Sequence, residues 1–324
     1  MSILDGKVLL ITGGTGSFGT EFCRVALSKH SPRAIRVFSR GELLQVQMEH
    51  DFADDRLRFF IGDVRDRDRL KRAMTDCDIV VHAAALKVVP VAEYNPREAI
   101  LTNVLGTMNV ADAAIDSGVD RCIMISSDKA VAALNLYGAT KAVGEKLWIQ
   151  SNVYGHTRFS AVRYGNVIGS RGSIIPLFTQ LSKQGYITLT DERMTRFWIT
   201  LSQGVDLVIN SLEYMTGGEI FIPKIPSMLL TDLADAIAPG AERIITGTRP
   251  GEKLHEVLIT EEEARHTIEL DDRYVIEPER AFAFWTENFS IGSPLPAGFS
   301  YASNTNKEWL TVEKLKEMIC QLKS

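Results

Sequence analysis

Two groups of polar residues in the middle of the chain have the types and spacing of a proton-transfer site. Tyr137 and Lys141 lie four residues apart, so a helix would place both side chains on one face. An ammonium beside a phenol lowers the phenol's pKa from about 10, which allows a tyrosinate to act as a base near neutral pH. Ser127, Asp128 and Lys129 end an apolar run upstream, and open α/β sheets bind ligands at the carboxyl ends of such strands. We expect these five residues to form the catalytic cluster.

A glycine-rich segment near the start of the chain is the expected pyrophosphate site. Residues 12–19 read TGGTGSFG after the strand-like run KVLLI, and a helix-like segment follows them. Glycines let the backbone approach a pyrophosphate closely, and a helix N-terminus supplies free N–H groups and partial positive charge. A turn that only joins strand to helix is the alternative. The expected contacts come from Gly13, Thr15, Gly16, Ser17, Phe18 and Gly19.

The end of the second expected strand favours NADP over NAD. It carries Ser39 and Arg40 where an NAD site would offer Asp or Glu to the ribose hydroxyls. Ser39 can hydrogen-bond a 2′-phosphate, and Arg40 can pair with its charge. The alternative is that Arg40 is solvated and Glu42 binds the ribose. Further expected cofactor contacts are Asp63, Val64, Ala83, Ala84, Lys87, Tyr137 and Lys141.

The elements that must position these residues alternate between strand and helix patterns through the first half of the chain. Short β-branched runs such as KVLLITGG, AIRVFSR and RCIMISSD are separated by amphipathic stretches. This alternation predicts an α/β fold with a Rossmann-type doubly wound parallel sheet. We expect an NADP-binding domain over residues 1–166, with a returning segment near 197–222, and a smaller mixed α/β substrate-binding lobe over 167–324. His82, at the end of an apolar run, is expected to be a hydrogen-bonded structural side chain.

The composition limits the classes of partner. A net charge of −5 and a pI near 5.8 give no general attraction for nucleic acid or an anionic membrane. No segment has the ~18 apolar residues that span a bilayer, and the N-terminus lacks a signal-peptide pattern. The four cysteines form no C-x-x-C pair, and no other cluster has metal-ligand spacing. We therefore expect a cytoplasmic protein without a metal site.

These residues together resemble those of the extended short-chain dehydrogenases/reductases, whose oxidation site combines a strand-end Ser or Thr with Y-x-x-x-K. The acid after the serine is similar to that of the nucleotide-sugar 4,6-dehydratases. Asp128-Lys129 is similar to the pair in the inverting UDP-N-acetylglucosamine dehydratases that start pseudaminic acid biosynthesis. The similarity continues through the segments ALKVVP, RYGNV, MTRFW, PGEKL and WLTVE. One departure is Ala132-Ala133, where relatives usually have Asn-Pro, and we expect it to loosen the catalytic loop.

The resemblance implies oxidation at C4, elimination of water across C5 and C6, and return of the hydride to C6. Tyr137, aided by Lys141 and Ser127, would accept the C4 hydroxyl proton while C4 passes a hydride to NADP. Lys129 would take the C5 proton, and protonated Asp128 would assist loss of the C6 hydroxyl as water. NADPH would return the hydride to C6, and reprotonation at C5 from the opposite face would invert that carbon.

Lysine can act as this base only if its pKa is lowered, and Lys87, Arg163 and Lys141 are the expected causes. The alternative is that Lys129 only forms a salt bridge with Asp128 or binds phosphate.

The resemblance also implies a UDP-N-acetylhexosamine substrate. Arginine forks in glycine-rich loops suit a diphosphate, and a nearby glutamate can bind ribose or uracil. Surface charges without a ligand are the alternative. The expected substrate contacts are Lys87, Asn166, Arg171, Arg196, Arg249 and Glu252.

Two other functions remain open. A sugar-nucleotide 4-epimerase or reductase would use the same fold, but those reactions have no water to eliminate, which argues against them given Asp128-Lys129. A non-catalytic NADP-binding regulator would be expected to lack Tyr137, Lys141 or Asp128. The helices that carry Asn103 and Tyr137 resemble the family's four-helix dimer contact, so a homo-oligomer is expected, although one subunit could cover their apolar positions itself.

Overall fold

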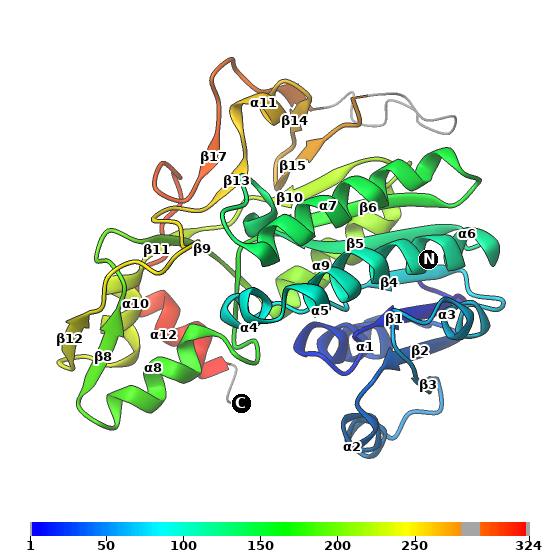
Figure 1. Ribbon diagram of the computed structural model, residues 1–324, viewed down its shortest axis with the longest axis horizontal. Coiled ribbons are helices and arrows are strands. Elements are labelled where there is room, and N and C mark those ends of the chain that lie inside the picture. The colour runs from blue at the N-terminus through cyan, green and yellow to red at the C-terminus, as the bar shows by residue number, and fades with distance from the viewer. Residues whose placement is uncertain (1, 280–291, 322–324) are drawn as a thin grey trace.

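The computed structural model describes residues 2–279 and 292–321, and its largest element is one twisted sheet (Figure 1). Seven strands run parallel in the order β3-β2-β1-β4-β5-β6-β10, which confirms the expected Rossmann-type fold. Their bounds are β1 (Val8–Thr12), β2 (Ala34–Ser39), β3 (Leu57–Ile61), β4 (Ile79–His82), β5 (Arg121–Ser127), β6 (Arg158–Tyr164) and β10 (Ile220–Pro223).

Helices cover both faces of this sheet (Figure 1). On one face α3, α6 and α7 pack side by side, and on the other α1 packs against α9. The cores of these layers are apolar, with β1 buried at all five positions. The helices are α1 (Ser17–Lys29), α2 (Glu42–Phe52), α3 (Arg67–Ala73), α4 (Val89–Tyr94), α5 (Pro96–Ile100), α6 (Gly106–Asp116), α7 (Leu136–Gln150) and α9 (Leu201–Tyr214).

The C-terminal half also extends the sheet beyond β10. Strand β15 pairs antiparallel with β10, β14 pairs with β15, and β16 pairs with β14. These short strands are β14 (Thr267–Glu269), β15 (Arg273–Ile276) and β16 (Ser293–Pro294). The chain therefore returns to the Rossmann layer twice, through α9 and β10 and again through β14–β16. The division at residue 166 remains a prediction.

A second group of elements has a core of its own, built around Phe178, Trp198 and Leu233. It contains a three-stranded sheet in the order β11-β9-β7, the parallel pair β12-β8 and three helices (Figure 1). The pair β13-β17 and the short helix α11 complete this half. The bounds are β7 (Asn166–Ile168), α8 (Ile174–Ser182), β8 (Tyr186–Leu189), β9 (Thr195–Thr200), β11 (Ser227–Leu229), α10 (Leu230–Ile237), β12 (Glu242–Ile245), β13 (Val257–Ile259), α11 (Glu261–Ala264), β17 (Tyr301–Ala302) and α12 (Val312–Gln321).

Side-chain caps fix where α7 and α9 begin. The Asn135 side chain accepts a hydrogen bond from the Gly138 N–H at 2.8 Å and starts α7 just before Tyr137. Thr200 and Gln203 form a capping box that starts α9 at Leu201. Trp198, two residues before this cap, therefore belongs to strand β9. Among the described helices, none is long and apolar enough to cross a membrane.

Candidate active site

A cleft of about 680 Å³ opens at the carboxyl ends of β1, β2, β4 and β5. Almost all of the expected cofactor residues line it, although they come from separate elements. They are Gly13, Thr15, Gly16, Ser17, Phe18, Gly19, Ser39, Arg40, Asp63, Val64, Ala83, Ala84, Lys87, Tyr137 and Lys141. Glu42 is the exception, because it is the exposed first residue of α2 and is absent from the described lining.

The glycine-rich loop has the geometry of a dinucleotide cradle. Gly13 has φ of +66°, and a Cβ built on it would lie 2.9 Å from the Ala84 backbone, so this position admits only glycine without displacement. Gly16 is the N-cap of α1 and brings no side-chain cap, which leaves the first-turn N–H groups without a side-chain acceptor. A pyrophosphate would fit these donors, and the residues present therefore fit a nicotinamide dinucleotide.

At the adenosine end of the cleft, Ser39 and Arg40 lie at the end of β2. Gln45 fixes Ser39 by donating to its Oγ and to its carbonyl, both at 3.0 Å. The Arg40 guanidinium is 60% exposed and lies 3.9 Å from Asp63, so it is available to an anion. Asp63 itself is held by Arg65 at 2.6 Å.

Four of the five expected catalytic residues, Ser127, Lys129, Tyr137 and Lys141, line the cleft, and Asp128 lies buried beside them, bonded to Ser127 and Lys129. Asp128 Oδ1 accepts hydrogen bonds from Ser127 Oγ at 2.8 Å and from Lys129 Nζ at 3.0 Å. Tyr137 contacts Ser127 from the start of α7, and Lys141 follows one turn later. Asp128 is fully buried, and the structure gives its Oδ2 no hydrogen-bond partner among the described residues.

The expected lowering of the Tyr137 pKa by Lys141 is wrong for this structure. Burial raises the pKa of Tyr137, helped by the charge of Asp128, and Lys129 and the Ser127 hydrogen bond offset only part of that rise. Lys141 instead donates to the Ile125 carbonyl at 2.5 Å. Its own pKa falls to about 8 because burial disfavours the ammonium more than Glu145 stabilises it.

The expected lowering of the Lys129 pKa is also wrong. Burial disfavours its ammonium, but the attraction of Asp128 and Glu256 outweighs burial and raises the pKa. The cation that acts to lower the Lys129 pKa is Arg196, and not Lys87, Arg163 or Lys141 as expected. For Asp128, burial raises the pKa, Lys129 lowers it and Glu256 raises it further, with a net increase.

Arg163 has a separate role. It forms a buried ion pair with Glu145 and Glu263, which attaches α7 to the segment after β13.

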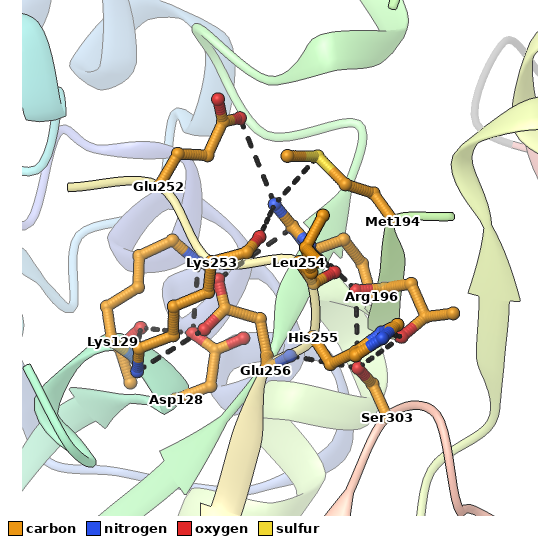
Figure 2. Close-up of polar contacts among 12 residues, drawn as sticks. Asp128, Lys129, Met194, Arg196, Glu252, Lys253, Leu254, His255, Glu256 and Ser303 are labelled. Atoms are coloured by element: carbon orange, nitrogen blue, oxygen red, sulfur yellow. Dashed lines mark hydrogen bonds and ion pairs between the residues drawn. The ribbon is translucent and has the colours of Figure 1, made fainter. Parts of the chain in front are cut away.

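Two further residues lie next to this catalytic group although they were not predicted there from the sequence. Both belong to the segment between β12 and β13. Glu256 Oε1 lies 3.5 Å from Lys129 Nζ, and Lys253 Nζ lies 3.7 Å from Glu256 Oε2 (Figure 2). Lys253 also donates to the Val131 carbonyl of the catalytic loop. The PGEKL segment contains Lys253, but no local pattern connects Glu256 with Lys129.

The expected substrate residues are more dispersed. Lys87 lines the cleft, and partial burial of its ammonium together with the Arg171 charge lowers its pKa, although much of the side chain is exposed. Asn166 begins β7 beside two lining residues, and its buried Oδ1 has no partner in the described part of the chain. Arg171 reaches the glycine-rich loop, where its backbone N–H donates to Ser17 Oγ at 3.0 Å and its guanidinium contacts the Thr15 carbonyl.

Arg196, Arg249 and Glu252 lie in the second group of elements. The Arg196 guanidinium is buried and donates to the Thr195, Lys253 and Leu254 carbonyls at 2.8 to 3.0 Å. It also lies 3.9 Å from Glu252 (Figure 2). Arg249 is exposed. Their substrate contacts remain a prediction, and Arg196 would have to exchange some of these partners to bind a diphosphate.

His82 has the structural role that was expected. Its Nδ1 lies 2.7 Å from Thr12 Oγ1 and its Nε2 lies 3.0 Å from Thr107 Oγ1. Because Thr107 already donates to the Asn103 carbonyl, Nε2 donates to Thr107 and Nδ1 accepts from Thr12. Burial lowers the pKa of His82 to about 3, so the ring is neutral.

The sheet order, the glycine-rich loop and the group of Ser127, Tyr137 and Lys141 at the cleft define an enzyme of the extended short-chain dehydrogenase/reductase type. The chain belongs to the polysaccharide biosynthesis protein family, which matches residues 9–278. It is 48% identical to the UDP-N-acetylglucosamine 4,6-dehydratase (inverting) of Campylobacter jejuni subsp. jejuni serotype O:23/36, covering 98% of both chains. It is also 40% identical to the UDP-glucose 4-epimerase of Rickettsia rickettsii, covering 98% of this chain and 96% of the other.

Solved structures place the fold in the same group. Pen from Bacillus thuringiensis matches with a TM-score of 0.90 and 37% identity over 99% of both chains. The dTDP-glucose 4,6-dehydratase DesIV from Streptomyces venezuelae, solved with NAD and TYD bound, matches with a TM-score of 0.70 and 25% identity over 76% of this chain and 86% of that one. A nicotinamide cofactor is thus supported, and the choice between NADP and NAD is a separate question.

Proposed function

We propose that this protein is an NADP-dependent UDP-N-acetylglucosamine 4,6-dehydratase that inverts C5. The observation that carries the proposal is the Asp128–Lys129 pair, 3.0 Å apart and beside Tyr137 in a cleft suited to a dinucleotide. A dehydratase needs an acid and a base next to its oxidation site, because water leaves across C5 and C6. Near-full-length similarity to an inverting dehydratase supports the same activity.

Tyr137 accepts the C4 hydroxyl proton, and the Ser127 hydroxyl orients its phenol. The Lys129 charge and the Ser127 hydrogen bond favour the tyrosinate, against the burial that disfavours it. Lys141, whose pKa is lowered to about 8 by burial, follows Tyr137 by one turn of α7. The bound nicotinamide supplies a site that takes a hydride from the sugar and later returns it. The C4 ketone formed in the sugar acidifies the hydrogen at C5.

The next steps use the acid–amine pair. Lys129, as the neutral amine, removes the C5 proton, and protonated Asp128 donates a proton to the departing C6 hydroxyl. Burial of Asp128 favours its protonated form, which suits the role of acid. Reprotonation at C5 from the opposite face gives the inverted 4-keto-6-deoxy sugar, the type of product with which pseudaminic acid biosynthesis starts.

NADP is the proposed cofactor because the adenosine end of the cleft carries a cation where an NAD site would carry an acid. Arg40 is exposed at the end of β2, next to a serine hydroxyl fixed by Gln45. The acid considered as an alternative ribose ligand, Glu42, is absent from the described lining of the cleft. These features suit a 2′-phosphate better than a free 2′-hydroxyl.

The 4-epimerase is the second candidate, and the Rickettsia relative supports it. An epimerase has no water to expel, so a buried acid and an amine at the oxidation site would have no step to serve. A non-catalytic NADP-binding regulator is opposed by the presence of Ser127, Tyr137 and Lys141 together at one wall of the cleft.

The test is incubation of the protein with UDP-N-acetylglucosamine and NADP, without added reductant, followed by NMR of the product. A dehydratase gives a C6 methyl doublet beside a C4 ketone, and the C5 coupling pattern reports inversion. Formation of the C4 epimer alone would support the epimerase, and recovery of unchanged substrate would remove both activities. Asp128→Asn is the matched variant, since it keeps shape and removes the acid.

The helices α6 and α7 are the proposed contact of a homo-oligomer. Leu105, directly before α6, Met108 in α6 and Val143 in α7 are apolar side chains exposed between 38% and 49%. Sedimentation of the native protein and of Met108→Lys distinguishes a shared contact from a monomer with exposed apolar side chains.

A further inference from the structure

Glu256 is a buried carboxylate that the proposed reaction does not use. It comes from the loop before β13, and its backbone is fixed by Ser303, with Glu256 N–H donating to Ser303 Oγ at 2.9 Å and Ser303 N–H donating to the Glu256 carbonyl at 2.8 Å. The side chain is almost fully buried and points at the Asp128–Lys129 pair, with Arg196 on its other side (Figure 2).

The contacts of Glu256 differ from those of a structural carboxylate. Glu219, also buried, accepts hydrogen bonds from Thr216 N–H, Gly217 N–H and Ser160 Oγ at 2.6 to 2.9 Å. Glu256 Oε2 has no hydrogen-bond partner among the described residues. Burying a carboxylate oxygen without a hydrogen bond is costly, and such an oxygen in a folded protein calls for an explanation such as a functional role.

Three cations surround Glu256 at ion-pair distance. Lys129 Nζ lies 3.5 Å and Arg196 Nε lies 3.7 Å from Oε1, and Lys253 Nζ lies 3.7 Å from Oε2. Asp128 is the nearest other acid, and it shares the Lys129 ammonium. A carboxylate held by charge at these distances, with few hydrogen bonds, acts on its neighbours mainly through its electrostatic potential.

The pair that Glu256 faces can exist in two forms with the same total number of protons. One form is the ammonium of Lys129 with the carboxylate of Asp128. Transfer of one proton from Nζ to the carboxylate, across 3.0 Å, gives the amine and the carboxylic acid. The second form is the one that the proposed dehydration requires, and no proton enters or leaves the site.

We propose that Glu256 is a positioning residue for the Asp128–Lys129 pair: it holds the Lys129 ammonium beside Asp128 and sets how readily the proton passes between them. This inference rests on the proposed dehydration for its catalytic meaning. Arg196 is also faced by Glu252 and His255. Lys253 is close enough to Asp128 and Lys129 for their charges to act on it as well. Tyr137 is the remaining titratable neighbour of the pair.

The direct test is titration of Lys129 by NMR in protein labelled at the lysine ε-carbons, with the Lys129 signal assigned by its loss in Lys129→Arg. Removal of the negative charge in Glu256→Gln makes the ammonium less stable, so we expect the midpoint to fall by about one pH unit or more. Glu256→Asp keeps the charge and should keep the midpoint close to that of the native protein. Glu252→Gln neutralises an acid on the same loop that contacts Arg196 and should move the midpoint less. A native midpoint in Glu256→Gln would overturn the inference, whatever happens to stability.

A second measurement connects the charge with turnover. Removing a negative charge lowers the proton affinity of both Asp128 and Lys129, so both limbs of the kcat/KM profile in Glu256→Gln should move to lower pH, while Glu256→Asp keeps their positions. If the maximum of kcat/KM fell while both limbs stayed at their native pH values, Glu256 would have only a packing role. If the native protein makes no dehydrated product, the proposed function fails, and the lysine titration still decides the electrostatic role of Glu256.

Discussion

A methyl group built on Gly138 would lie 2.1 Å from the carbonyl oxygen of Lys129. This contact sets the distance between α7, which carries Tyr137, and the short segment that carries Asp128 and Lys129. The glycine of the Y-G-A-T-K motif therefore has a steric role. It lets the oxidation residues and the elimination residues share one wall of the cleft.

Gly138→Ala should separate these two groups and lower kcat by roughly 100-fold, because displacements of about 1 Å at reacting groups have effects of that size. Alanine is the better helix former by about 1 kcal/mol, so a helix that tolerated the methyl group would become more stable. Steady-state kinetics and thermal unfolding measure both effects. Gly155→Ala is the control, since its nearest contact would be an Ile115 methyl at 3.6 Å. Full activity with raised stability would contradict the steric role.

Ala132 has φ of +44° and is exposed, so it adopts the left-handed conformation without a residue type that favours it. Asparagine is enriched in this region, which gives a physical reason for the Asn-Pro pair usual in relatives. Ala132→Asn should raise the free energy of unfolding by about 0.5–1 kcal/mol. Urea unfolding measures the change. Ala132→Val, which is β-branched, should shift it in the opposite direction, and equal stabilities of all three proteins would count against strain at this position.

Arg40→Ala should weaken NADP binding about 10- to 100-fold, the size expected for a charged hydrogen bond to phosphate, and leave NAD binding nearly unchanged. Isothermal titration with each dinucleotide measures this. Arg33→Ala, also exposed but outside the cleft lining, is the control. Equal loss for both dinucleotides would remove Arg40 from 2′-phosphate recognition.

Lys141 should make stability depend on pH. Its pKa is lowered from 10.5 to about 8 in the folded protein, mainly by burial. Between these values the unfolded chain binds more protons than the folded one, so stability rises as pH increases through this window, by about 3 kcal/mol in total. Lys141→Met removes this contribution. The free energy of unfolding of the native protein minus that of the variant should therefore increase by about 3 kcal/mol from pH 8 to 10.5. A constant difference would mean that burial does not lower the pKa of Lys141.

Much of the site could be predicted from sequence because its signals are local. The glycine-rich loop lies within eight residues, and Tyr137 and Lys141 are one helical turn apart. The charges acting on Lys129 could not be predicted, because Arg196 in β9 and Glu256 in the loop before β13 lie far from it in sequence and approach it through tertiary packing alone. The strands β14–β16 were missed for a related reason. They are two to four residues long, and of the three only β15 pairs directly with β10, while β14 and β16 join the sheet through β15.

The sequence did not allow the direction of the Lys129 pKa shift to be predicted. Burial acts as expected and disfavours the ammonium, but two carboxylates reverse the net shift. The proton needed at Asp128 is then the one that Lys129 gives up. Dehydration therefore requires that a proton pass from Lys129 to Asp128, while the total charge of the pair stays the same.

Hydrogen exchange in heavy water tests directly whether Lys129 removes the C5 proton. Native protein incubated with UDP-N-acetylglucosamine and NADP should give a 4-keto-6-deoxy product with solvent deuterium at C5, measured by NMR and mass spectrometry. Lys129→Ala should give neither C5 exchange nor product, while its NADP affinity stays near that of the native protein. C5 exchange at the native rate in Lys129→Ala would contradict the claim and assign the base to another group.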